Sequence, residues 1–312
     1  MAADEIKLTW SSIAPPEAAH SQGMKKFKEE VERLSDGRIT VELYFAGQIF
    51  TQEQELAACR EGTLDMAFYA ANWVAEFVPY VSMFGAAYTF VDYNHIRNVF
   101  DGEIGQQVFE DVVKATGVRP LSAFYLGTRE LNVVEKVGEV RHPDDLKGVK
   151  LRVPSSPAWI AMGKALGANP TPMSFGEIYM GLKTGAIEGQ DNPLRGAQDN
   201  KFYEVAKYFT LTDHVVDTVW ASINEQRWQS LSAEDQAIIK EAIMTAQKHT
   251  DQLVLEMDAG IKQYLLDQGC VIIEDADKAA FQEHAKWSYQ NESQDISQNW
   301  DWDLYDKIQA AK

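Results

Sequence analysis

The chain has 312 residues, of which 45% are hydrophobic and 24% are charged, and its formal net charge is −18. This composition is sufficient for the packed cores of two domains and is unlike that of a disordered chain. The negative charge repels nucleic-acid phosphates and anionic membrane surfaces, so it argues against both as partners. An anionic small-molecule ligand would need a local positive site within this negative field.

The first part of the chain alternates strands with amphipathic helices. The pattern predicts a strand at 6–11, a helix at 17–34, a strand at 39–45, a helix that begins at Thr51 with Gln54 in a capping box, and a strand at 64–69. This order of elements predicts a parallel sheet with right-handed crossovers.

A second α/β pattern occupies the middle of the chain, and a long helix follows it. Strands are predicted at 118–125, 149–153 and 187–190, with helices at 155–166 and 175–185 between the later ones. Residues 232–268 then read as one helix, for which Ser232 and Asp235 form a capping pair. A helix of this length exceeds the diameter of one small lobe, so we expect it to pass from one domain to the other.

The sequence contains none of the common local signatures of catalysis. A Walker loop, a dinucleotide-binding glycine motif, a nucleophile elbow and a zinc-protease motif are all absent, and the six histidines have no metal-ligand spacing. Cys59 and Cys270 form no metal or redox motif, and two buried thiols are favoured over a disulfide. We therefore expect no cofactor and no metal, and a protein that is not an enzyme.

Four segments in the middle of the chain together resemble one family. They are 127–131 (GTREL), 145–154 (DLKGVKLRVP), 167–179 (GANPTPMSFGEIY) and 185–193 (GAIEGQDNP), and 45–48 and 61–67 are similar to the same family. In this order and spacing they resemble the solute-binding subunits of tripartite ATP-independent periplasmic (TRAP) transporters, the DctP-type periplasmic solute-binding proteins. The resemblance covers nearly the whole chain.

This resemblance implies an α/β fold of the two-lobe periplasmic binding protein-like (type II) kind, with a long helix that braces both lobes. The expected lobe 1 comprises residues 1–125 and 215–252, and lobe 2 comprises 126–214 and 253–312, with crossing strands as the hinge. Hinge closure would trap a ligand between the lobes. The implied location is periplasmic. Met1–Asp4 has neither the basic region nor the apolar core of a signal peptide, so the alternatives are a mature form without its signal or a cytoplasmic protein.

By the same resemblance, Arg152 is the residue that binds a ligand carboxylate. A planar guanidinium presents paired donors to two oxygens, and such a charged pair is strong and directional. Arg152 also lies at the carboxyl end of a predicted strand, where ligands bind in open α/β sheets. The structural alternative is a surface arginine that ends a strand.

Further ligand-binding candidates follow from the resemblance, each with a structural alternative. Arg129, just after a predicted strand, is the second cation, or it forms an ion pair with Glu130 or another acid. Asn192 is a hydrogen-bonding group for the ligand, or a turn residue before Pro193. Phe175 packs on the apolar face of the ligand, or it belongs to the core. Asp191 departs from the glutamate that the family often has there.

Four remaining candidates rest on their positions. Trp73 and Asn72 follow the third strand, and Trp73 would stack on a sugar face or pack in the core. Glu17, beside the first loop, could contact hydroxyl groups. His214 lies near a predicted crossing between lobes, where a structural role is favoured over direct contact.

The function predicted from the sequence is therefore that of a TRAP solute-binding protein for a small organic acid. A sugar acid such as a uronate, an aldonate or sialic acid is favoured, and a C4-dicarboxylate or a 2-oxo acid is next. The membrane subunits of a TRAP transporter would be its partners, with no direct membrane insertion and no nucleic acid. The alternatives are a soluble hydrolase or lyase, or a ligand-sensing protein, on the same scaffold.

Overall fold

The computed structural model describes residues 5–312, so the expectation for Met1–Asp4 lies outside the described residues. The chain forms two compact units. Unit 1 comprises the residues up to Ala70 with Phe100–Leu126 and Thr218–Val254, and unit 2 comprises Ala71–Val99, Gly127–Asp217 and Leu255–Lys312. Four elements contribute to both units, namely α4 (Tyr93–Phe100), β4 (Val118–Val133), β8 (Tyr208–Asn224) and α10 (Ala233–Asp267).

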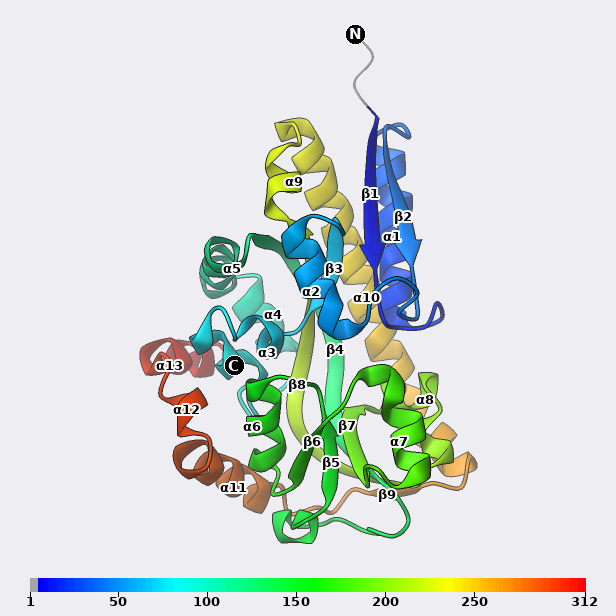
Figure 1. Cartoon of the computed structure of the whole chain (residues 1–312), viewed down its shortest axis with the longest axis vertical. Coiled ribbons are helices and arrows are strands. Elements are labelled where there is room, and N and C mark those ends of the chain that lie inside the picture. Colours follow the sequence, from blue (N-terminus) through cyan, green and yellow to red (C-terminus); the bar gives the residue numbers. More distant parts are fainter. Residues whose placement is uncertain (1–4) are drawn as a thin grey trace. The chain divides into compact units, whose positions relative to one another are not determined.

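Unit 1 is built on parallel strands that a helix covers. Its own elements are β1 (Ile6–Ser11), α1 (Ala19–Leu34), β2 (Ile39–Tyr44), α2 (Gln52–Glu61), β3 (Met66–Tyr69), α5 (Glu103–Thr116) and α9 (Glu225–Gln229). Strand β1 pairs in parallel with β2 and β3, as the sequence predicted, whereas β8 joins β3 antiparallel. Helix α1 runs beside β1 and β2 (Figure 1).

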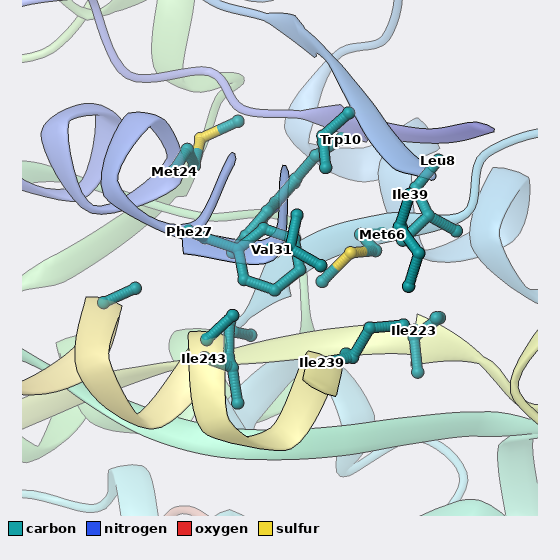
Figure 2. Packing of buried hydrophobic residues seen from close by; sticks show 14 of the residues in the cluster. Leu8, Trp10, Met24, Phe27, Val31, Ile39, Met66, Ile223, Ile239 and Ile243 are labelled. Carbon is teal, nitrogen blue, oxygen red and sulfur yellow. The ribbon is translucent and has the colours of Figure 1, made fainter. Parts of the chain in front are cut away.

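Hydrophobic side chains from the strands and from two helices meet in the core of unit 1. Met24, Phe27 and Val31 recur at helical spacing on α1 and are fully buried. From α10, Ile239 and Ile243 approach the same cluster, and Trp10 of β1 lies with its ring edge against Phe27 (Figure 2). Burying each such side chain contributes about 1.5–3 kcal/mol to stability, so this cluster holds the carboxyl ends of β1 and β3 in place.

Unit 2 has a mixed sheet with helices around it. Its strands follow the order β4, β7 (Gly189–Pro193), β5 (Lys150–Val153) and β6 (Asn169–Pro172). Strand β7 pairs antiparallel with β4 and parallel with β5, and β5 pairs parallel with β6. Strand β9 (Val271–Ile273) pairs with the first residues of β8.

The helices of unit 2 include four short 3₁₀ segments. In chain order they are α3 (Ala71–Val74), η1 (Pro79–Gly85), α4 (Tyr93–Phe100, whose last residue belongs to unit 1), η2 (Pro143–Leu146), α6 (Pro157–Ala165), η3 (Phe175–Glu177), α7 (Ile178–Thr184), α8 (Leu194–Asp199), η4 (Phe202–Glu204), α11 (Lys278–Asn291), α12 (Gln294–Ser297) and α13 (Trp302–Ala310). A second hydrophobic cluster forms around Ile178, Phe209 and Leu265.

The α/β fold class is confirmed, and several local predictions agree with the structure. Strand β1 has the predicted bounds, and the helix predicted at 232–268 is α10. The Ser232 hydroxyl accepts from the main-chain N–H of Asp235 at 3.1 Å and donates to its carboxylate at 2.7 Å. Cys59 and Cys270 are both buried free thiols. Among residues 5–312, no helix is long and apolar enough to cross a membrane.

Two strand predictions were wrong. The strand predicted at 118–125 continues to Val133, so Arg129 lies within β4 rather than after it. The continuation depends on β7, whose residues pair with β4 from Arg129 to Val133, and this pairing joins segments distant in sequence. The second error is that no strand was predicted at β6, which contains Pro170 and Pro172. It lies at an edge of the sheet, where proline costs no ladder hydrogen bond.

The compact units differ from the expected lobe boundaries chiefly at Ala71–Val99, which packs in unit 2 although the expected lobe 1 included it. Its partners come from distant parts of the chain. The His95 ring bonds the carbonyl of Ile308 at 2.7 Å, and the indole of Trp300 donates to Ser82 Oγ at 2.9 Å. The expected lobe boundaries stay a prediction, and Asn72 and Trp73 belong to unit 2.

Gly23 provides a test of packing in the core of unit 1, and Gly260, an exposed helical glycine of unit 2, provides the control. A Cβ on Gly23 of α1 would overlap Thr250 Oγ1, and Thr250 is fully buried on α10. We expect Gly23→Ala to lower the free energy of unfolding by about 1–3 kcal/mol. Gly260 lies inside α10, and nothing lies within 4 Å of a Cβ placed on it. Gly260→Ala should therefore raise the free energy of unfolding by about 0.5–1 kcal/mol. Urea denaturation of both variants measures the difference, and equal effects would contradict the packing.

Candidate functional site

The candidate site in unit 2 is organised around two buried arginines on neighbouring parts of one sheet. Arg129 lies on β4 and Arg152 on β5, with β7 between these strands. Their side chains are almost fully buried, at 4% and 1% exposed. A buried guanidinium stays charged and needs compensating contacts, so the surroundings of each arginine indicate what it does.

Arg129 has its charge compensated within the protein. Its Nε donates to Asp191 Oδ2 at 2.6 Å, and a terminal nitrogen donates to Asp217 Oδ2 at 3.1 Å. The other terminal nitrogen donates to the main-chain carbonyl of Asp191 at 2.7 Å. The face of the guanidinium lies 4.6 Å from the ring centroid of Trp159. The structure shows ion pairs of Arg129, with Asp191 and Asp217 as partners in place of Glu130, and contact of Arg129 with a ligand stays a prediction.

His214 completes this group from β8. Its Nε2 lies 3.2 Å from Asp191 Oδ2, and its Nδ1 lies 2.7 Å from Thr212 Oγ1. Burial alone would raise the pKa of Asp191, but the attraction of Arg129 and the hydrogen bond with His214 hold it well below its ordinary value. Asp191 is therefore ionised at neutral pH, and His214 contacts the ion pair within unit 2.

Arg152 has different surroundings. Its Nε donates to the main-chain carbonyl of Met173 at 2.8 Å, and its guanidinium lies 5.8 Å from the ring centroid of Phe175. Met173 and Phe175 flank the start of η3, immediately after β6. These two contacts orient the guanidinium near the carboxyl end of β5.

The other predicted residues lie at varied places. Phe175 is half-buried and packs edge-to-face against Phe202 at 5.9 Å. Asn192 is half-buried on β7, where its amide donates to the side chain of Gln190. Asn72 is buried on α3, and its main-chain carbonyl accepts from Ser156 Oγ at 3.1 Å. Trp73 is half-buried on the same helix.

Glu17 differs from the other seven candidates because it belongs to unit 1. It is exposed, in the turn before α1. The structure gives it no contact that indicates a binding role. The sequence did not single out Asp217, although an acid within the apolar run 215–220 was a usable signal for a buried ion pair.

Comparison with known proteins identifies the family of this chain. Residues 10–295 match the model of the bacterial extracellular solute-binding protein family 7. The chain is 34% identical, over 91% of its length and 86% of the relative, to a solute-binding protein of Roseobacter denitrificans. The chain belongs to family 7.

Solved structures of TRAP periplasmic solute-binding proteins share its fold. One from Roseobacter denitrificans, with bound 3-deoxy-D-manno-oct-2-ulosonic acid, has a TM-score of 0.92 and 33% identity over 99% of this chain and all of that one. Another, from Chromohalobacter salexigens with bound D-glucuronate, has a TM-score of 0.90 and 30% identity with the same coverage. These family 7 relatives are solute-binding proteins, so the family predicted from the sequence is confirmed.

Unit 1 of this family 7 protein also contains a buried carboxyl group. Glu55, on α2, is 2% exposed, and its main-chain carbonyl accepts from the hydroxyl of Tyr69 at 3.1 Å. Burial raises the pKa of Glu55 to about 8, although contact with Ser11 opposes the rise. The side chain is therefore mostly protonated at neutral pH.

The raised pKa of Glu55 predicts a loss of stability in alkali. The stabilising neutral form is fully populated below the ordinary pKa of 4.5 and is lost as pH rises through about 8. We expect the free energy of unfolding to fall by up to about 3 kcal/mol between pH 6 and pH 9.5. Glu55→Gln should remove most of this dependence, and Glu61→Gln, at an exposed position on the same helix, should not. Chemical denaturation across this pH range measures the free energy of unfolding of the three proteins. The same pH dependence in all three would contradict the prediction.

The buried ion pair of Arg129 predicts a large effect in unit 2. Asp191→Asn removes a charge that Arg129 needs, so we expect a loss of about 3 kcal/mol in unfolding free energy at pH 7. The contribution of Asp191 is present above its ordinary pKa near 3.8 and is lost as pH falls below it, so wild type and variant should converge in acid. Glu274→Gln, which breaks the exposed pair with Lys262, should cost less than about 1 kcal/mol. An equal loss in both variants would contradict a special role for the buried pair.

Proposed function

We infer that this protein is a TRAP solute-binding protein that binds a hydroxylated monocarboxylate, with Arg152 as the residue that pairs with the carboxylate. The observation that carries this proposal is the position of Arg152, which is buried near the carboxyl end of β5 and is oriented there by the Met173 carbonyl beside the ring of Phe175. A guanidinium in this position presents paired donors that can form a bidentate pair with a carboxylate. Family 7 relatives with bound sugar acids support the choice of ligand.

The ion pairs of Arg129 favour a ligand with one carboxylate over a ligand with two. A second carboxylate near Arg129 would meet two acids that already neutralise it, inside a chain whose net charge is −18. Like charges at short range oppose binding. A sugar acid therefore fits better than a C4-dicarboxylate, and the relatives with bound D-glucuronate and 3-deoxy-D-manno-oct-2-ulosonic acid support this class.

The remaining ligand contacts follow from the chemistry of the predicted residues. Phe175 stacks against Arg152 and would offer an apolar surface to a sugar carbon chain. Asn192 would exchange hydrogen bonds with a hydroxyl, because an amide both donates and accepts. Asn72, Trp73 and Glu17 stay candidates for hydroxyl contacts, and enclosure of the acid by the two units stays a prediction.

The family also determines the proposed partners and location. We place the protein in the periplasm, where it would deliver the acid to the membrane subunits of a TRAP transporter. It would release the acid unchanged, which separates this function from that of a hydrolase or lyase. Incubation with D-glucuronate followed by mass spectrometry of the recovered acid tests that point.

Substitution of Arg152 tests the proposed function directly. Arg152→Ala should weaken the binding of D-glucuronate at least about 30-fold, because truncation of a buried charge partner costs 2 kcal/mol or more. Arg152→Lys should recover only part of this loss, since an ammonium group cannot form the two parallel bonds. Isothermal titration calorimetry measures both.

Controls separate loss of binding from loss of folding. Arg141→Ala removes an exposed arginine of unit 2 that pairs with Glu139, and it should leave affinity unchanged. D-glucose, which lacks the carboxylate, should not bind the wild type, and succinate should bind more weakly than D-glucuronate. Unchanged affinity of a folded Arg152→Ala variant would reject the assigned role.

A further inference from the structure

Trp159 occupies a defined position at the start of α6. The helix is capped by Ser156, whose hydroxyl accepts from the main-chain N–H of Trp159 at 3.4 Å. The same hydroxyl donates to the carbonyl of Asn72. Trp159 itself is 2% exposed and is among the largest fully buried side chains. The capped helix start therefore holds the indole in one orientation.

One face of the indole covers Arg129. The guanidinium carbon lies 4.6 Å from the ring centroid, while Asp191 and Asp217 take the edges of the same guanidinium. Such stacking of a cation on tryptophan is favourable, more so where water is excluded. Arg129 is thus held by an aromatic face and by two carboxylates.

Two buried polar atoms on the residues that contact Arg129 have no hydrogen-bond partner among residues 5–312, namely Trp159 Nε1 and Asp191 Oδ1. Buried indole N–H groups usually find an acceptor, and an unsatisfied one is costly. The indole can only donate, and the ionised carboxylate can only accept. A hydroxyl group does both, so it matches this pair of unsatisfied atoms.

We propose that Trp159 is a specificity-determining residue, whose indole N–H donates to a hydroxyl oxygen of the bound acid while that hydroxyl donates to Asp191. This role rests on the proposed function and narrows it. The site would select acids that carry a hydroxyl at this point over acids of equal length that lack it. The aromatic face would hold Arg129 and Asp191 in place for this contact.

Two conservative variants separate the donor from the aromatic face. Trp159→Phe keeps a ring over Arg129 and removes only the N–H, so it should weaken D-glucuronate binding about 3- to 10-fold. Trp159→Leu removes both and should weaken it further. Trp300→Phe is the matched control, because Trp300 lies in the same unit and its N–H already bonds Ser82. It should leave the affinity within about 2-fold.

Monodeoxy analogues of D-glucuronate identify the hydroxyl. For one analogue the wild type and Trp159→Phe should bind equally well, because the contact that the variant lacks is absent from that ligand as well. For the other analogues the difference between the two proteins should persist. A Trp159→Phe variant with wild-type affinity for D-glucuronate and for every analogue would overturn the role of the donor.

A spectroscopic measurement gives an independent readout. The chain has eight tryptophans, and loss of one indole N–H signal in Trp159→Phe assigns that of Trp159 in a ¹⁵N spectrum. Saturating D-glucuronate should move this signal downfield, as expected when a hydrogen bond forms. A signal that stays in place while the wild type binds would reject this inference alone. Failure of the wild type to bind D-glucuronate, 3-deoxy-D-manno-oct-2-ulosonic acid or any other organic acid would reject the proposed function and this role with it.

Discussion

The pairing of Arg129 with Asp191 and Asp217 is the interaction on which the rest of the site depends. A guanidinium that is 4% exposed needs compensating charge, and the two carboxylates supply it at 2.6 and 3.1 Å. The same contacts keep Asp191 ionised and bring His214 into the group. Arg129, Asp191, Asp217 and His214 therefore form one buried charged group in unit 2.

The strands that carry these charged residues hold the ion pair in place in unit 2. Arg129 is on β4, Asp191 is on β7 and Asp217 is on β8, so three strands contribute one charged group each. Main-chain pairing of β4 with β7 places Arg129 and Asp191 two register positions apart on adjacent strands. Trp159 closes the open face of the guanidinium from α6. Each contact is polar and directional, so the group has little freedom to adopt another geometry.

Glu55 in unit 1 and Asp191 in unit 2 show how the surroundings of a buried carboxyl group set its pKa. Burial raises the pKa of Glu55 to about 8, and the nearby negative charge of Glu53 adds to the rise. Asp191 is at least as buried, yet Arg129 keeps its pKa low. In an acidic chain such as this one, the placement of a few arginines therefore decides which buried acids carry charge.

Much of this architecture is visible in local patterns of the sequence. Alternation of apolar and polar residues at 6–11 predicted β1, and Ser232 with Asp235 predicted the start of α10, because such signals act over a few neighbouring residues. Arg152, before Pro154 at the end of a strand, was likewise recognisable as a candidate. Local patterns did not reveal that Arg129 lies within β4 or that β6, with its two prolines, is a strand. They also did not reveal that Ala71–Val99 packs in unit 2.

The sequence by itself determined the fold class, the family and the nomination of Arg152 and Arg129, since these follow from periodicity and from motifs of contiguous residues. Only the tertiary structure decided which acids pair with Arg129. Asp191 and Asp217 are 62 and 88 positions from Arg129 in the chain, and sheet pairing brings them within hydrogen-bonding distance. Compensation of a buried charge depends on that spatial proximity, which local sequence patterns do not encode.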